Sequence, residues 1–327
     1  MQEAPPRPFG ERRYRAWNDD VRRRHGGRVQ KVSVSAATTC PNRDGSVGRG
    51  GCTFCNNDGF TPSYLRGQPS ITAQIDTGLA FLRRRYPGSV QFIAYFQTYT
   101  NTHGDFDRLC AAYDEALAHP AIGGLAIGTR PDCLPAPVLQ HLAGLAGRGI
   151  LELEIGVEST DDEALRRVNR GHDWACSVDA IERAAAAGLD VTAHLILGLP
   201  GESRASMLAG AARLSALPLT ALKLHQLQIV RGTALARQWR ADPASVPLFD
   251  EAGYIGLLAD FVERLSPAIG LQRLASEVPP ALKLAPAWNL RLPELPPRLS
   301  AELARRESWQ GRLCAQAPRG ADRLPVN

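Results

Sequence analysis

The sequence lacks any apolar run long enough to cross a membrane. A transmembrane helix needs roughly 20 consecutive apolar residues, and no stretch of this chain approaches that length. The first six residues, Met1 to Pro6, contain no apolar signal core. These two absences predict a cytoplasmic protein that makes no membrane contact.

A regular structural zinc site is also missing. Such a site uses four closed Cys or His ligands, commonly in two close pairs, whereas this chain has one Cys-x2-Cys pair and no His-x3-His pair. A zinc ion would need to recruit a further ligand from elsewhere, such as Cys133 or His103. The sequence shows no internal repeat, and beyond residues 40–55 it has no obvious further cysteine motif for an iron–sulfur cluster.

An excess of one charge is lacking outside the first 31 residues. Of the 327 residues, 44% are hydrophobic and 22% charged, which suits one large α/β domain or one with an appendage. The net charge is +5, and residues 1–31, with nine Lys or Arg and four Asp or Glu, account for all of it. This basic segment either contacts nucleic acid or an acidic partner, or is simply solvated.

Three of the seven cysteines lie within sixteen residues, in the pattern Cys40-x11-Cys52-x2-Cys55. The stretch is rich in glycine and follows the alternating run 32–36, so we expect a loop at the end of a strand. Three thiolates on such a loop can converge on a metal, and the last two have a metal-knuckle spacing. A cubane iron–sulfur cluster usually takes four cysteines, so one bound by these three would leave one iron open for a ligand. The spacing alone leaves this cluster and a zinc site as alternatives.

Strand and helix patterns alternate about six times, which is the signature of βα units and a parallel sheet. In the fourth expected strand, apolar residues alternate with Glu152 and Glu154, and His194 and Lys223 lie within later strands. Polar side chains on one face of several strands favour a barrel with a solvated interior. We therefore expect an α/β fold, a (β/α)6 partial TIM-type barrel with an open polar lumen and a C-terminal accessory segment. The expected strands are residues 32–36, 90–96, 125–129, 151–158, 191–197 and 222–229.

Composition divides the chain into three parts. Residues 1–28 form the basic N-terminal segment, residues 29–240 the barrel, and residues 241–327 the accessory segment. The last part contains 11 prolines, and only one helix, near residues 254–265, is clear in it.

Several strand ends carry candidate binding groups, each with a structural alternative. Gly198 opens a Gly-Leu-Pro-Gly turn that could approach a ligand or be an ordinary βα turn. Arg130 could clamp a carboxylate or pair with Asp132. Glu158 could bind ribose hydroxyls or be held by a neighbouring arginine, and His194 could be a ligand or a core histidine.

Together these stretches resemble the radical S-adenosylmethionine (SAM) proteins of the YhcC-like group. More distantly, the chain is similar to oxygen-independent coproporphyrinogen III oxidase and to the radical SAM domain of Elongator's catalytic subunit. The likeness covers most of the chain. It rests on the cysteine loop and on residues 95–100, 128–133, 153–159, 168–173, 194–202, 222–227 and 284–288.

The resemblance implies a [4Fe-4S] cluster on Cys40, Cys52 and Cys55. SAM would bind the remaining iron and be cleaved reductively to methionine and a 5′-deoxyadenosyl radical. The usual spacing in these enzymes is Cys-x3-Cys-x2-Cys, and this chain has the longer first gap of the YhcC-like group. The SAM contacts that the motifs imply are Thr98, Tyr99, Thr100, Arg130, Glu158, Arg170, His194 and Gly198. The family's glycines are absent from residues 98–100, and His194 replaces an Asp of the oxidase.

The same resemblance implies an electron donor of the flavodoxin or ferredoxin type. The substrate is not specified by the motifs. Because the basic segment comes just before the strand that leads to Cys40, we expect it beside the mouth of the site, where it would hold an RNA backbone. RNA is thus our candidate substrate. The alternative is a non-catalytic iron–sulfur or zinc protein that binds a partner or nucleic acid.

Overall fold

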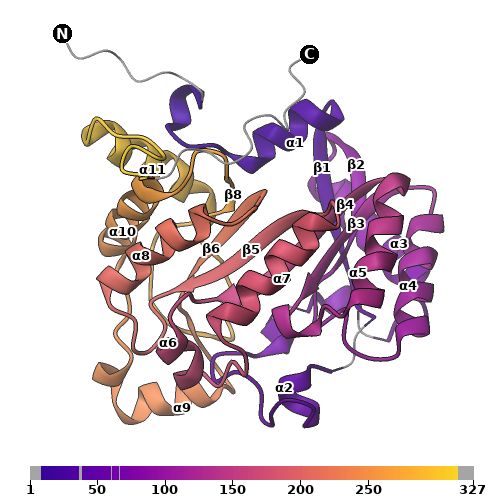
Figure 1. Cartoon of the computed structure of the whole chain (residues 1–327), viewed down its shortest axis with the longest axis horizontal. Helices are drawn as coiled ribbons and strands as arrows, with labels where there is room; N and C mark the ends of the chain where they lie inside the picture. The colour runs from indigo at the N-terminus through magenta and orange to yellow at the C-terminus, as the bar shows by residue number, and fades with distance from the viewer. Residues whose placement is uncertain (1–8, 37–38, 60, 66, 316–327) are drawn as a thin grey trace.

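The fold is an α/β half-barrel, seen in a computed structural model that describes residues 9–36, 39–59, 61–65 and 67–315. In this described part, seven parallel strands form one curled sheet in the order β1-β2-β3-β4-β5-β6-β8 (Figure 1). The predicted partial barrel is therefore confirmed. The strands are β1 (Arg28–Val34), β2 (Ser89–Phe96), β3 (Ile122–Thr129), β4 (Ile150–Glu158), β5 (Asp190–Leu197), β6 (Ala221–Gln226) and β8 (Gly270–Arg273).

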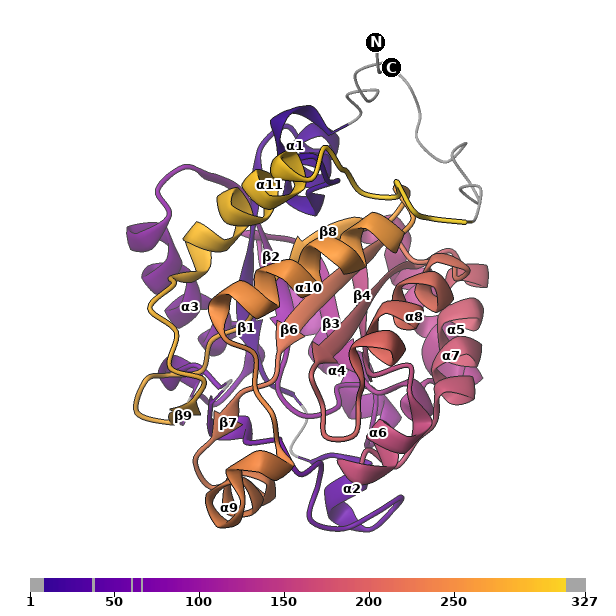
Figure 2. The ribbon, with the colours of Figure 1, turned by 90° about the vertical axis from the view of Figure 1, so that its left-hand side faces the viewer.

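Helices cover the outer face of this sheet (Figures 1 and 2). Most follow a strand and return the chain to the start of the next one, as βα units require. The helices are α1 (Trp17–His25), α2 (Pro41–Asp44), α3 (Ile71–Arg85), α4 (Phe106–Ala118), α5 (Ala136–Leu145), α6 (Asp162–Arg167), α7 (Trp174–Ala186), α8 (Arg204–Ser215), α9 (Ala234–Ala241), α10 (Glu251–Arg264) and α11 (Leu295–Arg305). A short antiparallel pair, β7 (Ile229–Val230) with β9 (Lys283–Ala285), lies outside the main sheet.

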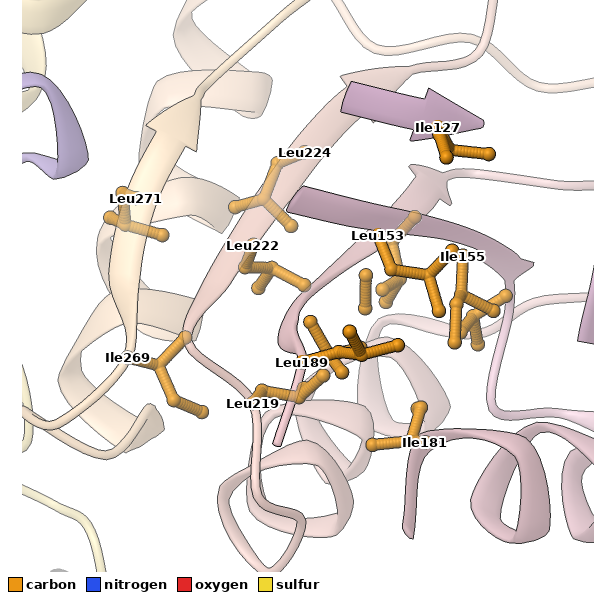
Figure 3. Packing of buried hydrophobic residues seen from close by; sticks show 14 of the residues in the cluster. Ile127, Leu153, Ile155, Ile181, Leu189, Leu219, Leu222, Leu224, Ile269 and Leu271 are labelled. Carbon is orange, nitrogen blue, oxygen red and sulfur yellow. The ribbon is translucent and has the colours of Figure 1, made fainter. Parts of the chain in front are cut away.

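The hydrophobic core lies between the outer face of the sheet and these helices. Leu153 and Ile155 of β4 are buried in one cluster with Ile181 of α7 and Leu222 of β6 (Figure 3). Burial of each such side chain is worth about 1.5–3 kcal/mol. This layer therefore fixes which face of every strand turns outward.

The opposite face of the strands carries polar residues, as the alternation in β4 predicts. Glu152 and Glu154 turn inward and meet Lys31 of β1, whose Nζ lies 2.7 Å and 2.5 Å from their carboxylate oxygens. Because β1 and β4 are three strands apart in the sheet order, this contact spans the lumen. The interior is polar at the level of Glu154, where these ion pairs lie, and Ile93 and Ala126 form a small apolar cluster with Tyr95 on the same face.

The C-terminal segment is more regular than the sequence indicated. Its strand β8 completes the main sheet beside β6, and α10 and α11 are both well formed. Pro296 and Pro297 lie in the first turn of α11, where proline costs little because the N–H it removes has no helical partner. The expected sixth strand also ends earlier, at Gln226, and the chain resumes as β7. The boundaries at residues 28 and 240 stay a prediction.

The basic helix α1 does not lie beside the cysteine loop. Figure 1 shows α1 and α2 at opposite ends of the molecule, since α1 precedes β1 and the cysteines follow it. The seven residues of β1 span about 23 Å at 3.3 Å per residue. The expectation of a basic flank at the mouth of the site is therefore wrong for α1, while residues 1–8 lie outside the described range. In the described residues, no helix combines the length and the apolarity needed to cross a membrane.

Candidate active site

The cysteine loop lies at the carboxyl end of the strands. Cys40 precedes the short helix α2, and Cys52 and Cys55 follow it. Two backbone bonds fasten the loop to neighbouring elements: Thr53 N–H donates to Val168 O at 2.9 Å, and Leu235 N–H donates to Thr53 O at 2.8 Å. Cys52 is buried, whereas Cys40 and Cys55 are partly exposed. These two backbone hydrogen bonds thus hold the loop firmly in place.

Two side chains donate hydrogen bonds toward the sulfur of Cys52. Asn42 Nδ2 lies 3.7 Å and Arg170 Nη1 lies 3.6 Å from Sγ. Asn42 is 1% exposed, and a Cβ at Gly48 would stand 2.3 Å from its Oδ1, so glycine is needed for this close approach. Donors to a cysteine sulfur stabilise negative charge on it and tune a bound cluster.

Without a bound metal, the Cys55 thiol of this loop is protonated at neutral pH. Burial, reinforced by the neighbouring Cys52 thiol, raises the pKa of Cys55 to about 11. Metal coordination reverses such a shift, because a ligated thiol loses its proton. Among the described residues, no three His, Cys, Asp or Glu side chains form a group that could hold a metal ion. The fit to a cluster therefore rests on the donor set of three thiols on one loop, together with the donors around Cys52.

Arg130 and Arg170 converge beside this loop from β3 and from the turn after α6. Arg170 Nη2 donates to Gly156 O at 2.6 Å and lies 3.4 Å from Glu158 Oε1. Arg130 donates to Asp132 through Nε and Nη2, at 2.8 Å and 2.7 Å, while its Nη1 is buried with no partner in the described chain. Arg130 thus forms the predicted structural pair with Asp132 and keeps one donor for a ligand.

His172, an uncharged histidine, lies beside Arg170. His172 Nε2 accepts a hydrogen bond from Arg170 Nε at 2.8 Å. Burial and the positive Arg170 lower the pKa of His172 to about 3. The ring therefore stays uncharged and adds no third positive charge to the site.

Two residues predicted to contact SAM have strained backbones. Tyr99 has φ 61° and Glu158 has φ 69°, values that a residue with a Cβ seldom adopts. Tyr99 is 38% exposed, while its neighbours Thr98 and Thr100 are buried. Such strain is concentrated at functional sites, where surrounding structure compensates for it. Both residues lie at strand ends on the cysteine side of the barrel.

Gly198 lies in the turn after β5 with φ 92°. Its N–H donates to Glu202 Oε2 at 3.1 Å, and a Cβ there would stand 3.0 Å from the ring of Phe249. Glu202 also receives the Leu199 N–H and contacts Ser159 Oγ. The turn is therefore stabilised from within the protein, and its contact with SAM stays a prediction.

His194 faces the lumen rather than the cysteine loop. Its Nε2 lies 2.9 Å from Glu154 Oε2, and Tyr95 OH donates to the same oxygen at 2.5 Å. Burial alone would raise the pKa of Glu154, but Lys223, Lys31 and His194 hold it well below its usual range. A SAM contact by His194 stays a prediction, since Glu154 occupies its Nε2 here.

Sequence reasoning missed three members of these networks: Asn42, Lys31 and Tyr95. Lys31 offered a signal, because in a strand it lies on the face opposite Val32 and Val34 and so points inward. Tyr95 begins the stretch 95–100, which is part of the family resemblance but does not indicate that Glu154 is its partner. Asn42 gave no signal, because an Asn in a glycine-rich loop usually serves a turn.

The family models match both halves of the chain. The model of the radical SAM superfamily matches residues 38–211, and that of the Radical_SAM C-terminal domain matches residues 219–302. The chain belongs to the radical SAM superfamily. This membership makes the protein an enzyme and implies SAM and a [4Fe-4S] cluster as its cofactors.

Two relatives align with most of the chain, and a third aligns with about half of it. YtqA of Bacillus subtilis is 31% identical over 96% of this chain and 97% of its own, and YhcC of Escherichia coli is 36% identical over 82% and 85%. A tRNA uridine(34) acetyltransferase of Dehalococcoides mccartyi is 30% identical over 51% of this chain and 36% of its own. The predicted likeness to the YhcC-like group is confirmed.

One solved structure shows the same fold at lower sequence identity, and a second is similar to a smaller extent. The Elp3 protein of Methanocaldococcus infernus, with an N-terminal deletion, superimposes with a TM-score of 0.63 at 16% identity, over 86% of this chain and 64% of its own. Coproporphyrinogen III oxidase (HemN) of Escherichia coli gives a TM-score of 0.47 at 18% identity, over 76% of this chain and 52% of its own.

Proposed function

We propose that this protein binds a [4Fe-4S] cluster through Cys40, Cys52 and Cys55 and cleaves SAM reductively to start radical chemistry. One observation carries the proposal. Three thiols share one anchored loop, and the buried sulfur of Cys52 faces the guanidinium of Arg170 at 3.6 Å. A cluster on three cysteines leaves one iron for SAM. When bound, the reduced cluster and SAM together supply a 5′-deoxyadenosyl radical.

The residues around the loop would orient SAM. The unpartnered Nη1 of Arg130 would donate to the SAM carboxylate, next to the charge of Arg170. Glu158, at the end of β4, would accept hydrogen bonds from the ribose hydroxyls. Residues 98–100 would face the amino end of SAM. The protein's contribution is thus orientation and exclusion of water, while the radical chemistry belongs to the cofactors.

We further propose that an acidic electron donor of the flavodoxin or ferredoxin type docks over the cysteine loop. Arg43 and Arg49 of this loop are exposed, and Arg43 Nη2 lies 3.2 Å from Cys55 O. Their charge complements an acidic partner. Arg49→Glu should slow cluster reduction by flavodoxin but not by dithionite, and Arg84→Glu on α3 is the control. Equal slowing with both reductants would reject this docking face.

RNA is the substrate class to test first. Its support is the likeness of about half of this chain to a tRNA uridine(34) acetyltransferase. The basic helix α1 does not support it, because α1 lies at the far end of the molecule from the cysteines (Figure 1). Phosphate contacts would make the affinity for bulk tRNA fall steeply with salt. Binding that is absent or independent of salt would instead favour a small molecule inside the barrel.

Formation of 5′-deoxyadenosine tests the proposed function. Anaerobically reconstituted protein, reduced in the presence of SAM, should release it, and loss of a cysteine ligand should abolish the release. A protein that keeps its metal but releases no deoxyadenosine would favour the alternative, a non-catalytic iron–sulfur or zinc protein. Metal analysis then distinguishes iron from zinc.

A further inference from the structure

A second candidate site lies at the amino ends of the strands, away from the cysteines. A cavity of about 290 Å³ opens where the two edge strands of the sheet, β1 and β8, face each other beneath α1. The chain before α1 reaches this seam, because Ala16 bridges to Leu271 of β8. The cavity is lined from α1, β1, β6 and β8 and from Tyr86 just before β2.

The lining of this cavity is strongly cationic. Five of its eleven residues carry positive charge and none is Asp or Glu; the cations are Arg22, Arg28, Lys31, Lys223 and Arg273. Asn18, Gln30 and Gln272 add amide groups. Side chains from four separate elements therefore direct charge of one sign into one concave space.

Carboxylates neutralise this charge only in part. Glu154 pairs with both Lys31 and Lys223, and Glu152 pairs with Lys31 alone. Arg28 lies over the ring of Tyr86 at 4.4 Å, with no carboxylate at ion-pair distance in the described chain. Arg273 also has no carboxylate at ion-pair distance in the described chain. Arg22 lies 3.7 Å from Asp19, which is exposed. The two lumen carboxylates thus leave the arginines without buried counter-charges.

The positive charge around the cavity affects the pKa of a buried lysine inside the barrel. Burial lowers the pKa of Lys223 to about 7, and the positive Lys31 and Arg273 act in the same direction, against Glu154. Lys223 is 2% exposed. A concave site lined by one sign of charge concentrates its field and draws ions of the opposite sign.

We propose that this cavity binds a small, multiply charged anion of the pyrophosphate or phosphate-ester class. Arginine forks match phosphate oxygens bidentately, and the volume lies near the lower end for small-molecule sites. The side chains of Lys31 and Lys223 are 23% and 3% exposed, whereas the three arginines are exposed, so a small anion reaches the lysines more readily than a polynucleotide backbone does. Because the cavity and the cysteine loop lie at opposite ends of β1, this site is independent of the cluster.

Calorimetric titration of the full-length protein with sodium pyrophosphate tests the proposal. Both the cluster-free and the reconstituted protein should bind one equivalent, so a failed cluster assignment would not affect the result. Arg28→Gln and Arg273→Gln should each weaken binding at least about tenfold, as expected for the loss of a charged hydrogen bond. Arg84→Gln is the matched control, because Arg84 is an exposed arginine of α3 that bonds to its own helix at Ala80 O.

Thermal unfolding of each variant shows whether it is folded. Neither Arg28 nor Arg273 forms an ion pair in the described structure, so both variants should unfold near the wild-type temperature. Three results would overturn the proposal. They are no saturable binding to wild type at millimolar pyrophosphate, equal affinity in all three variants, and tRNA binding that depends on Arg28 and Arg273 while pyrophosphate does not bind.

Discussion

The Nη1 atom of Arg170 lies 3.6 Å from the sulfur of Cys52. This contact joins the cysteine loop, before β2, to the turn that follows α6. The same guanidinium donates to Gly156 O of β4 and to His172. Arg170 therefore holds the cysteine loop against β4. The end of this strand, at Glu158, is where we propose that the ribose of SAM binds.

The first prediction concerns SAM affinity. Arg130→Gln and Arg170→Gln should each weaken SAM binding by about 1.5–3 kcal/mol, the scale of a hydrogen bond to a charged group. Equilibrium binding to the reconstituted protein measures the loss. The control is Arg167→Gln, whose arginine is exposed and pairs with Glu163. Wild-type affinity in both test variants, with full iron content, would show that these arginines do not contact SAM.

The sequence predicted the elements that repeat and missed those that depend on distant partners. Alternation in β4 placed Glu152 and Glu154 on the inner face, because side chains of a strand point to opposite sides. Their partner Lys31 lies 123 residues from Glu154, and no local pattern encodes that contact. Strand β8 has only four residues, too few for a periodic signal, so its place in the sheet was missed.

The candidate site shows the same division. The grouping of Cys40, Cys52 and Cys55 was visible in the sequence, since three thiols on one glycine-rich loop are typical of a metal site. The position of α1 was not, because sequence adjacency to the cysteine loop says nothing of the length of β1 between them. Asn42 acquires its contact with Cys52 only through the folded loop.

The second prediction concerns the stability of the lumen network. Glu154→Gln removes the charge that both Lys31 and Lys223 contact, which leaves the buried Lys223 without its counter-charge and Lys31 with Glu152 alone. Breaking a buried pair in this way costs about 3–5 kcal/mol, so the free energy of unfolding in urea should fall by that amount. The exposed Glu182→Gln should change it by less than about 0.5 kcal/mol. A similar small loss for Glu154→Gln would mean that the network does not stabilise the barrel.

The third prediction concerns pH. Burial raises the pKa of Glu202 to about 7 in the folded protein, from 4.5 for an ordinary glutamate. Folding therefore favours the protonated form. The stability that this group contributes is complete below about pH 4.5 and is lost as the pH rises through about 7. The total loss is about 3 kcal/mol at roughly 1.4 kcal/mol per pKa unit.

A glutamine at this position mimics the protonated acid, because its amide N–H₂ can donate to Ser159 while its oxygen accepts the Gly198 and Leu199 N–H groups. Urea unfolding between pH 5 and 8 should therefore show the wild type losing stability relative to Glu202→Gln. Parallel pH curves for the two proteins would contradict the assigned shift.

The central claim is that Cys40, Cys52 and Cys55 hold one cluster. The most direct test counts iron and acid-labile sulfide after anaerobic reconstitution of the wild type and of each Cys→Ala variant. We expect about four of each per wild-type chain, as a [4Fe-4S] cluster requires, and a clear loss in all three variants. Cys110→Ala, which alters a cysteine of helix α4, should retain the full count. A complete four-iron cluster in any of the three loop variants would contradict the account.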